Sequence, residues 1–192
     1  MILPFSTKIN GKESYFVEKI IKGLYNNSLI SRDKAIELLS PQILSKIIPK
    51  KHQSDYIKKA VIYSIQFDKT IEHKPKIHTI REDKKNRWKV GTKIDFFINA
   101  RQKNMFRFVP VLPVVSTQEF EINWHSSNEK LFVRVYIDGE SFARIDFDKE
   151  LYVSGQMLHL ANNDGFDTIE AFFDYFNKDY KGKIIHWTNF KY

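Results

Sequence analysis

The dipeptide Asp138-Gly139, together with the two runs that flank it, strongly constrains the fold of this chain. Asp-Gly between alternating runs is the typical signal of a two-residue β-hairpin, because both residues adopt positive φ readily. The flanking strands are predicted at residues 131–137 and 141–147. From residue 76 onward, short runs bounded by turn residues recur, so the second part of the chain is expected to be mostly antiparallel sheet.

Further strands are predicted around this hairpin, at residues 2–9, 76–82, 93–100, 105–115, 120–124 and 183–188. A helix is predicted at 13–25, because its apolar residues recur at i, i+3, i+4 and i+7. A second helix, near 167–177, begins at Asp167 or Thr168 as cap and runs through Phe176. The pattern of short strands with helices at two places predicts a small α+β barrel of five or six strands.

Residues 28–72 differ in character from both flanks. They predict three short helices, at 31–39, 40–48 and 54–67, with Pro49 ending the second. Three helices resemble a helix-turn-helix, yet the third lacks a row of Arg, Asn or Gln to read base edges. The segment is therefore interpreted as a helical insertion, packed against the β core or serving as a surface for a protein partner.

Composition bounds the rest of the interpretation. A chain of 192 residues, 42% hydrophobic, suits a single domain spanning 1–192 with the insertion inside it. Cysteine is absent, which excludes disulfides, thiol nucleophiles and Cys-based metal sites. The six histidines lack metal-ligand spacing, so neither a metal nor a cofactor is expected. There is no apolar run of about 18 residues and no leader-like start, so we expect a cytoplasmic protein without a membrane association.

The positive charge of the chain is concentrated in one segment. Residues 74–107 hold eleven lysines or arginines against three acids, a net charge of +8 that equals the charge of the whole chain. The flanking segments carry +5 and −5 and cancel. Such a basic block is typical of a protein that binds a phosphate backbone, although a solvated surface without a partner is the alternative.

Residues 76–81, Lys-Ile-His-Thr-Ile-Arg, lie within this basic segment. In a regular strand, Lys76 and His78 share one face while Thr79 and Arg81 share the other. A bulge or turn near Lys76 would bring Lys76 and Thr79 together. A threonine hydroxyl becomes a nucleophile when a neighbouring base removes its proton, and lysine is a candidate base.

The order of elements resembles that of the ASCH domain, a branch of the PUA-like superfamily. The resemblance covers most of the chain outside 28–72. It rests on the residues at 5–8, 15–20, 76–81, 88–91, 94–97, 163–166 and 184–187. It implies a small, mostly antiparallel PUA-like barrel with flanking helices, and an association with RNA or with a modified nucleoside or nucleotide.

One group of ASCH proteins is similar to this chain in a further motif and removes the acetyl group from N4-acetylcytidine. Its lysine, three positions before the threonine of Thr-Ile-Arg, matches Lys76, and the threonine matches Thr79. Its downstream carboxylate is a glutamate, and an ungapped match places Asp164 there. The resemblance therefore implies Thr79 as nucleophile, Lys76 as base and Asp164 as the orienting acid.

Binding without catalysis is the function that we expect first, and amide hydrolysis on an acylated nucleoside is the alternative. Strand propensity explains Thr79, and turn propensity explains Asp164, without any chemistry. Trp88, between two cations, would either stack on a base or plug the end of the barrel. The candidate binding residues are His78, Arg81, Lys84, Lys85, Arg87, Trp88, Lys89, Arg101, Lys103 and Arg107.

Overall fold

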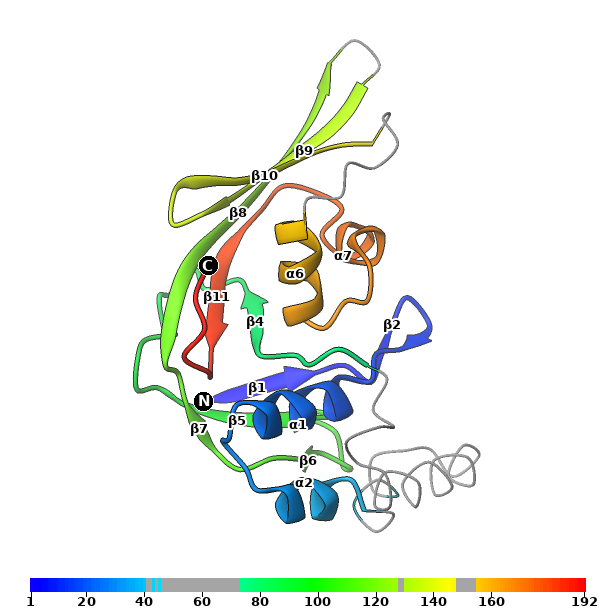
Figure 1. Ribbon diagram of the computed structural model, residues 1–192, viewed down its shortest axis with the longest axis vertical. Coiled ribbons are helices and arrows are strands. Elements are labelled where there is room, and N and C mark those ends of the chain that lie inside the picture. Colours follow the sequence, from blue (N-terminus) through cyan, green and yellow to red (C-terminus); the bar gives the residue numbers. More distant parts are fainter. Residues whose placement is uncertain (41–42, 44, 46–72, 128–129, 148–154) are drawn as a thin grey trace. The chain divides into compact units, whose positions relative to one another are not determined.

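The computed structural model describes residues 1–40, 43, 45, 73–127, 130–147 and 155–192 (Figure 1). The predicted helix at 54–67, and most of the predicted helix at 40–48, lie outside these residues. The chain divides into two compact units. Unit 1 comprises residues 1–76 and 93–112, and unit 2 comprises residues 77–92 and 113–192. The boundary between the units therefore falls between Lys76 and Ile77, inside the Lys-Ile-His-Thr-Ile-Arg motif at 76–81.

Unit 1 is built on a small mixed sheet. Strand β1 (Ile2–Phe5) runs parallel to β5 (Lys93–Ile98), and β6 (Phe106–Arg107) pairs antiparallel with β5. Strand β7 (Leu112–Pro113) also pairs with β5. Strands β2 (Lys8–Ile9) and β3 (Lys12–Glu13) form a separate hairpin around Asn10-Gly11, both at positive φ. The predicted strand at 2–9 is therefore two strands.

Two helices of unit 1 follow the sequence pattern closely. Helix α1 (Phe16–Asn26) buries Val17, Ile20, Ile21 and Leu24, the residues that predicted it. Helix α2 (Arg32–Leu38) begins after Ser31, whose hydroxyl accepts a hydrogen bond from the Lys34 amide at 3.2 Å. That bond satisfies one of the free amides at the helix start. The first helix predicted in the 28–72 segment is thus confirmed.

Unit 2 contains a sheet of five strands in the order β10-β9-β8-β11-β4. Its strands, all antiparallel to their neighbours, are β4 (His78–Arg81), β8 (Ser116–Ser127), β9 (Lys130–Ile137), β10 (Glu140–Asp146) and β11 (Tyr180–His186). Asp138 and Gly139, at φ 52° and 84°, form the predicted hairpin turn between β9 and β10. Both values match the turn type that Asp-Gly favours.

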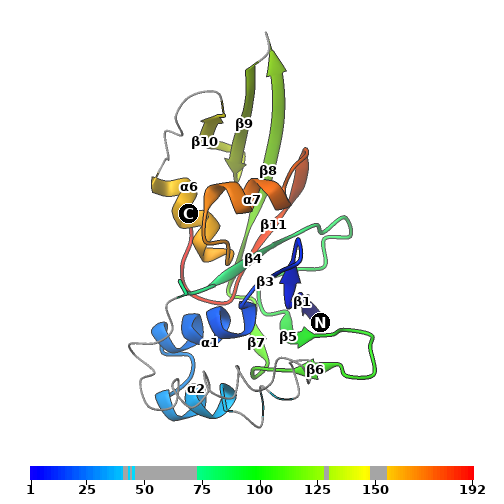
Figure 2. The ribbon, with the colours of Figure 1, turned by 90° about the vertical axis from the view of Figure 1, so that its right-hand side faces the viewer.

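Helices α6 (Gly155–Asn163) and α7 (Ile169–Tyr175) cover one face of this sheet (Figures 1 and 2). Thr168 caps α7 by accepting a hydrogen bond from the Ala171 amide, as predicted. On the covered face, Phe120 of β8 meets Phe172 of α7 edge-on, with ring centroids 6.4 Å apart. We call this side the inner face, and the opposite side the outer face.

The structure is α+β with mostly antiparallel sheets, as the sequence predicted. The closed barrel is not found: in the described residues no sheet closes on itself. The physical reason is that α6 and α7 already bury the apolar side of the unit 2 sheet, so closure is not needed to remove it from water.

Within the same described residues, no helix is long and apolar enough to cross a membrane.

Helix α6 was not predicted, because only the turn at its end carries a local signal. The Gly165 amide bonds to the Asn162 carbonyl and the Phe166 amide to the Ala161 carbonyl, both at 2.8 Å. Gly165 has φ 93°. This pattern is the Schellman ending of a helix. The turn propensity at Asp164 therefore marks the C-terminal cap of α6.

Gly182 lies inside β11 and not before it, which corrects the predicted strand start. A Cβ at this position would lie 2.5 Å from the Arg81 carbonyl oxygen and 2.9 Å from the Tyr180 ring.

We expect Gly182→Ala to lower the free energy of unfolding by about 2 kcal/mol or more, because the backbone of β4 must move away. Urea unfolding measures this. Gly155→Ala, where a Cβ meets nothing within 4 Å, is the control and should stay within about 0.5 kcal/mol of the parent.

Candidate functional site

The connection after β4, residues 82–92, is a structured loop that we call the basic loop. Asp83 organises it: one carboxylate oxygen accepts the Arg87 amide at 2.8 Å and the other accepts the Trp88 amide at 2.9 Å. The Asn86 amide bonds to the Asp83 carbonyl at 2.9 Å. A single aspartate thus satisfies three backbone donors, which fixes the backbone that carries the cations.

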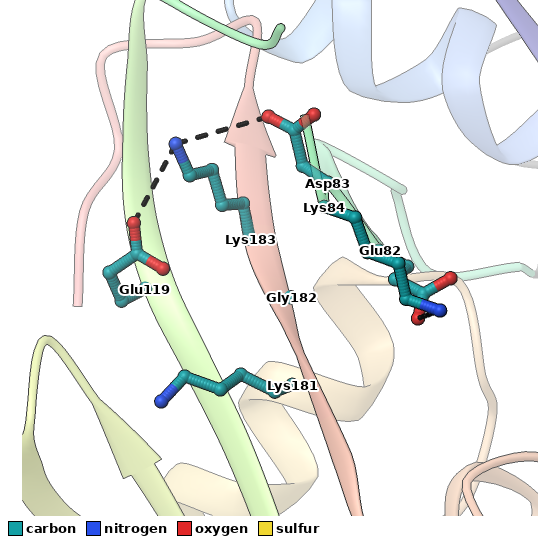
Figure 3. A pocket seen from close by; sticks show the side chains of 7 residues that line it. All are labelled: Glu82, Asp83, Lys84, Glu119, Lys181, Gly182 and Lys183. Atoms are coloured by element: carbon teal, nitrogen blue, oxygen red, sulfur yellow. Dashed lines mark ion pairs between the residues drawn. The ribbon is translucent and has the colours of Figure 1, made fainter. Parts of the chain in front are cut away.

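Three contacts hold the basic loop to the rest of unit 2. Trp88 is only 6% exposed, so its ring belongs to the interior of the unit, although the barrel end that it was expected to plug is not formed. Lys183 of β11 reaches the Asp83 carboxylate at 3.9 Å (Figure 3). Lys183 also donates to the side-chain oxygen of Asn86. At its far end, the Gly91 amide bonds to the Val114 carbonyl at 2.9 Å.

The loop presents its cations to solvent. Lys84, Lys85, Arg87 and Lys89 are all exposed. Lys84 pairs with Glu82 at 3.0 Å, but its side chain is 80% exposed, so this pair contributes little to stability and yields readily to a phosphate. Four of the predicted binding residues are therefore together on one rigid loop.

A hollow of about 410 Å³ lies beside the loop on the outer face (Figure 3). It is lined by Glu82, Asp83, Lys84, Glu119, Lys181, Gly182 and Lys183. Lys183 bridges Asp83 to Glu119, the latter at 3.6 Å. Three acids balance three lysines in this lining, so the hollow itself is close to neutral. The attraction for an anion therefore comes from the exposed loop and not from the hollow.

Three further predicted cations lie in the other unit, whereas Arg81 belongs to unit 2 with the basic loop. Arg101, Lys103 and Arg107 belong to the β5–β6 connection of unit 1 and are exposed. Arg107 pairs with Asp95 at 3.2 Å, and its guanidinium lies 5.9 Å from the Phe97 ring centroid. The basic segment that is continuous in sequence is thus divided between two units.

The inner face of unit 2 carries a group of polar side chains that are buried, except for the half-buried Tyr192. We call this group the polar cluster, and it consists of His78, Gln118, Asn163, Asp164, His186 and Tyr192. The register of β4 with β11 places His78 directly opposite His186, with ring centroids 5.3 Å apart. Both rings are fully buried. Gln118 follows on β8, also buried, in the inward phase that is apolar further along the strand.

Hydrogen bonds assign the donors and acceptors at Gln118. Its Nε2 donates to Asp138 Oδ2 at 2.9 Å, so its Oε1 must accept. His186 Nε2, 3.1 Å from that oxygen, therefore carries the proton. The other ring nitrogen, Nδ1, is buried and has no hydrogen-bond partner among the described residues. Burial, and secondarily Lys191, lowers the pKa of His186 to about 4 against the pull of Asp138, so the ring is neutral at pH 7.

A second chain of bonds links Tyr192 to His78. Asn163 Nδ2 donates to the Tyr192 hydroxyl at 2.9 Å, and that hydroxyl lies 2.7 Å from His78 Nε2. Burial raises the pKa of Tyr192, which keeps the phenol protonated and able to donate to His78. His78 Nδ1 lies 3.8 Å from Asp164 Oδ1.

Asp164 closes the free edge of the sheet. Its Oδ1 accepts the Ile80 amide of β4 at 3.1 Å, a donor that no further strand would satisfy. Asp164 is buried, with 3% of the residue exposed. Asp164, the acid that the resemblance implies, therefore lies against β4, beside His78 and the Ile80 backbone.

The other members of the predicted catalytic trio differ in setting. Thr79 is 2% exposed and pairs with Ile185, so strand alternation turns it to the face opposite His78, together with Arg81. Lys76 belongs to unit 1, where its amide bonds to the Lys19 carbonyl at 2.9 Å. Its ammonium lies 4.9 Å from the Phe16 ring centroid and the residue is 1% exposed.

Several residues of the polar cluster were not singled out in the sequence. Gln118 has a detectable signal, a polar residue in the inward phase of an otherwise apolar strand. Asn163 and Tyr192 have none, because a helix end and an irregular segment carry no period.

Comparison with protein-family models, curated proteins and solved structures found no match to this chain. The resemblance to the ASCH domain therefore rests on the sequence motifs.

Protonation of His186 is expected to destabilise the fold. Its pKa of about 4 lies below the ordinary 6.5, so the unfolded chain takes up a proton first as the pH falls. The free energy of unfolding should decrease by about 3 kcal/mol between pH 6.5 and 4 and level off below. Urea unfolding at stepped pH measures the decrease. His186→Gln keeps a donor but does not titrate, so its curve should lack this component; parallel curves would contradict the assignment.

Proposed function

We propose that this chain is a PUA-like module of the ASCH type that binds single-stranded RNA through the basic loop. The observation that carries the proposal is the construction of that loop. The Asp83 carboxylate, on a side chain that is 2% exposed, and the buried Trp88 hold the loop in a single shape. Preorganised cations bind phosphates at a lower entropic cost than cations on a mobile chain.

The charge of the loop supports a polyanionic partner. Lys84, Lys85, Arg87 and Lys89 outnumber Glu82 and Asp83, and the Asp83 carboxylate is already engaged by two amides and Lys183. The available charge is therefore positive. Phosphate contacts of this kind give affinity without sequence reading, so binding is expected to be weak and dependent on salt.

Charge reversal of the loop tests the proposal. Lys84→Glu, Lys85→Glu and Arg87→Glu together should weaken binding of a single-stranded oligonucleotide regardless of its sequence. Each lost phosphate contact should reduce the slope of log affinity against log salt by about 0.7. Fluorescence anisotropy over a salt series measures both quantities.

The control changes the same net charge elsewhere. Lys12, Arg32 and Lys178 are exposed outside the basic loop, and their reversal to Glu should leave most of the affinity in place. An equal loss in both triple variants would show that only the overall charge matters. An affinity that salt does not change would exclude a phosphate partner.

Amide hydrolysis on an acylated nucleoside is the second candidate. The observation in its favour is the burial of Lys76 against Phe16 and Phe5, since lysine is rarely fully buried without a reason. In this function, as the resemblance implies it, the Thr79 hydroxyl attacks the acyl carbon, Lys76 takes the hydroxyl proton, and the bond from that carbon to the base nitrogen breaks. The leaving amine takes its proton from Lys76, and Asp164 is the orienting acid. Water then releases the acyl group from Thr79.

Release of cytidine from N4-acetylcytidine is the assay for this second function. Thr79→Ala and Lys76→Ala should each remove nearly all turnover, because groups that act as a unit lose activity together. Asp164→Glu restores the residue of the resembling group and should raise turnover or leave it unchanged. Its extra methylene must fit a 3% exposed site that holds the Ile80 amide, so turnover is compared per folded protein. Activity that survives Thr79→Ala would assign the nucleophile elsewhere.

A further inference from the structure

Tyr192 fills the polar cluster in an unusual way, because both its backbone and its side chain are bound by side chains of the sheet and of α6. Its amide donates to Gln118 Oε1 at 2.9 Å, and Gln118 Nε2 donates to its carbonyl at 3.1 Å. Its hydroxyl meets His78 and Asn163. Its ring lies edge-on to His78 at 5.5 Å and to Phe190 at 4.8 Å.

The segment 189–192, which carries Tyr192, lies outside the regular hydrogen-bond ladder. Strand β11 ends at His186, and the backbone bonds of Tyr192 go to a side chain and not to a strand. Asn189 and Lys191 are exposed. Figures 1 and 2 show this segment returning beside β8 and β11 in one view and beside α6 in the other. It would leave the cluster without unpairing any strand.

The groups beneath Tyr192 are suited to reading a heteroaromatic ring. The amides of Gln118 and Asn163 supply donors and an acceptor, and the neutral imidazole of His186 keeps one buried nitrogen without a partner among the described residues. Phe142 and His159 flank the Tyr192 ring at 5.5 and 6.3 Å. Amide edges combined with aromatic walls are the usual means of recognising an unstacked base.

We propose that Tyr192 occupies the binding site of an uncharged, single six-membered heteroaromatic ring, that of a pyrimidine nucleoside, and that the segment 189–192 is its intramolecular competitor. This inference rests on the nucleotide-binding function proposed above and assigns the base to a place distinct from the phosphate-binding loop. The single ring of Tyr192 sets the size, which excludes a bicyclic purine. The phenol of Tyr192, which burial keeps protonated, is likewise uncharged, and this sets the charge of the ring that the site accepts.

Competition of this kind predicts tighter ligand binding when the competitor is weakened. A ligand whose site is open only part of the time binds with an affinity reduced by that fraction. Tyr192→Ala removes the ring and should bind cytidine and uridine at least about tenfold more tightly than the parent chain. Adenosine should gain nothing. Isothermal titration calorimetry with the three nucleosides measures these affinities.

Further variants give the matched controls. Asn189→Ala changes an exposed residue of the same segment and should leave nucleoside affinity unchanged. Gln118→Ala, combined with Tyr192→Ala, should lose most of the gained cytidine affinity, because the reading amide is gone. If Tyr192→Ala fails to fold by circular dichroism, Tyr192→Phe decides: it keeps the ring, loses two hydrogen bonds, and should gain about fivefold.

The outcomes separate this inference from the function on which it rests. The proposal is overturned if cytidine affinity is unchanged in folded Tyr192→Ala, or in Tyr192→Phe where Tyr192→Ala does not fold. Tyr192 would then be a residue that only stabilises the core. Equal gains for adenosine and cytidine overturn the pyrimidine assignment. Oligonucleotide binding is measured on the same variants, and the Lys84, Lys85, Arg87 reversal should weaken it while cytidine binding persists. Nucleoside binding at the polar cluster and oligonucleotide binding at the basic loop can therefore be disproved independently of each other.

Discussion

The pairing of β4 with β11 is the interaction on which both candidate sites of unit 2 depend. It places His78 opposite His186 on the inner face and Arg81 opposite Lys183 on the outer face. The pairing requires a close approach at Gly182, where a Cβ would meet the Arg81 carbonyl oxygen at 2.5 Å. Asp164 then binds the Ile80 amide and covers the edge that β4 leaves open.

Local patterns in the sequence were sufficient to predict elements whose stability is local. Asp138-Gly139 predicted its hairpin because the turn itself requires positive φ at both residues. Ser31 and Thr168 predicted helix starts, because a cap acts on amides three positions away. The apolar period of α1 identified its buried face. These elements, and the α+β class, followed from the chain alone.

Features that depend on distant contacts did not follow from the sequence. Helix α6 has a mixed polar and apolar sequence, and its place is decided by packing against the sheet. Trp88 stands among cations, yet it is buried, because Asp83 turns the backbone inward. The basic segment divides between two units at Lys76, a boundary that charge counting does not show. Tyr192 joins residues far apart in the chain, which no periodicity encodes.

Strand β11 couples the two kinds of chemistry that the sites would use. Lys183 supports the basic loop from the outer face, where charge acts in contact with solvent. His186 belongs to the inner face, where burial keeps it neutral and hydrogen bonds decide recognition. The two residues are three positions apart, so strand alternation necessarily separates them. A slip of one residue would exchange the faces, placing a lysine in the interior and a neutral imidazole under the loop. The register that Gly182 permits is therefore a condition for both sites at once.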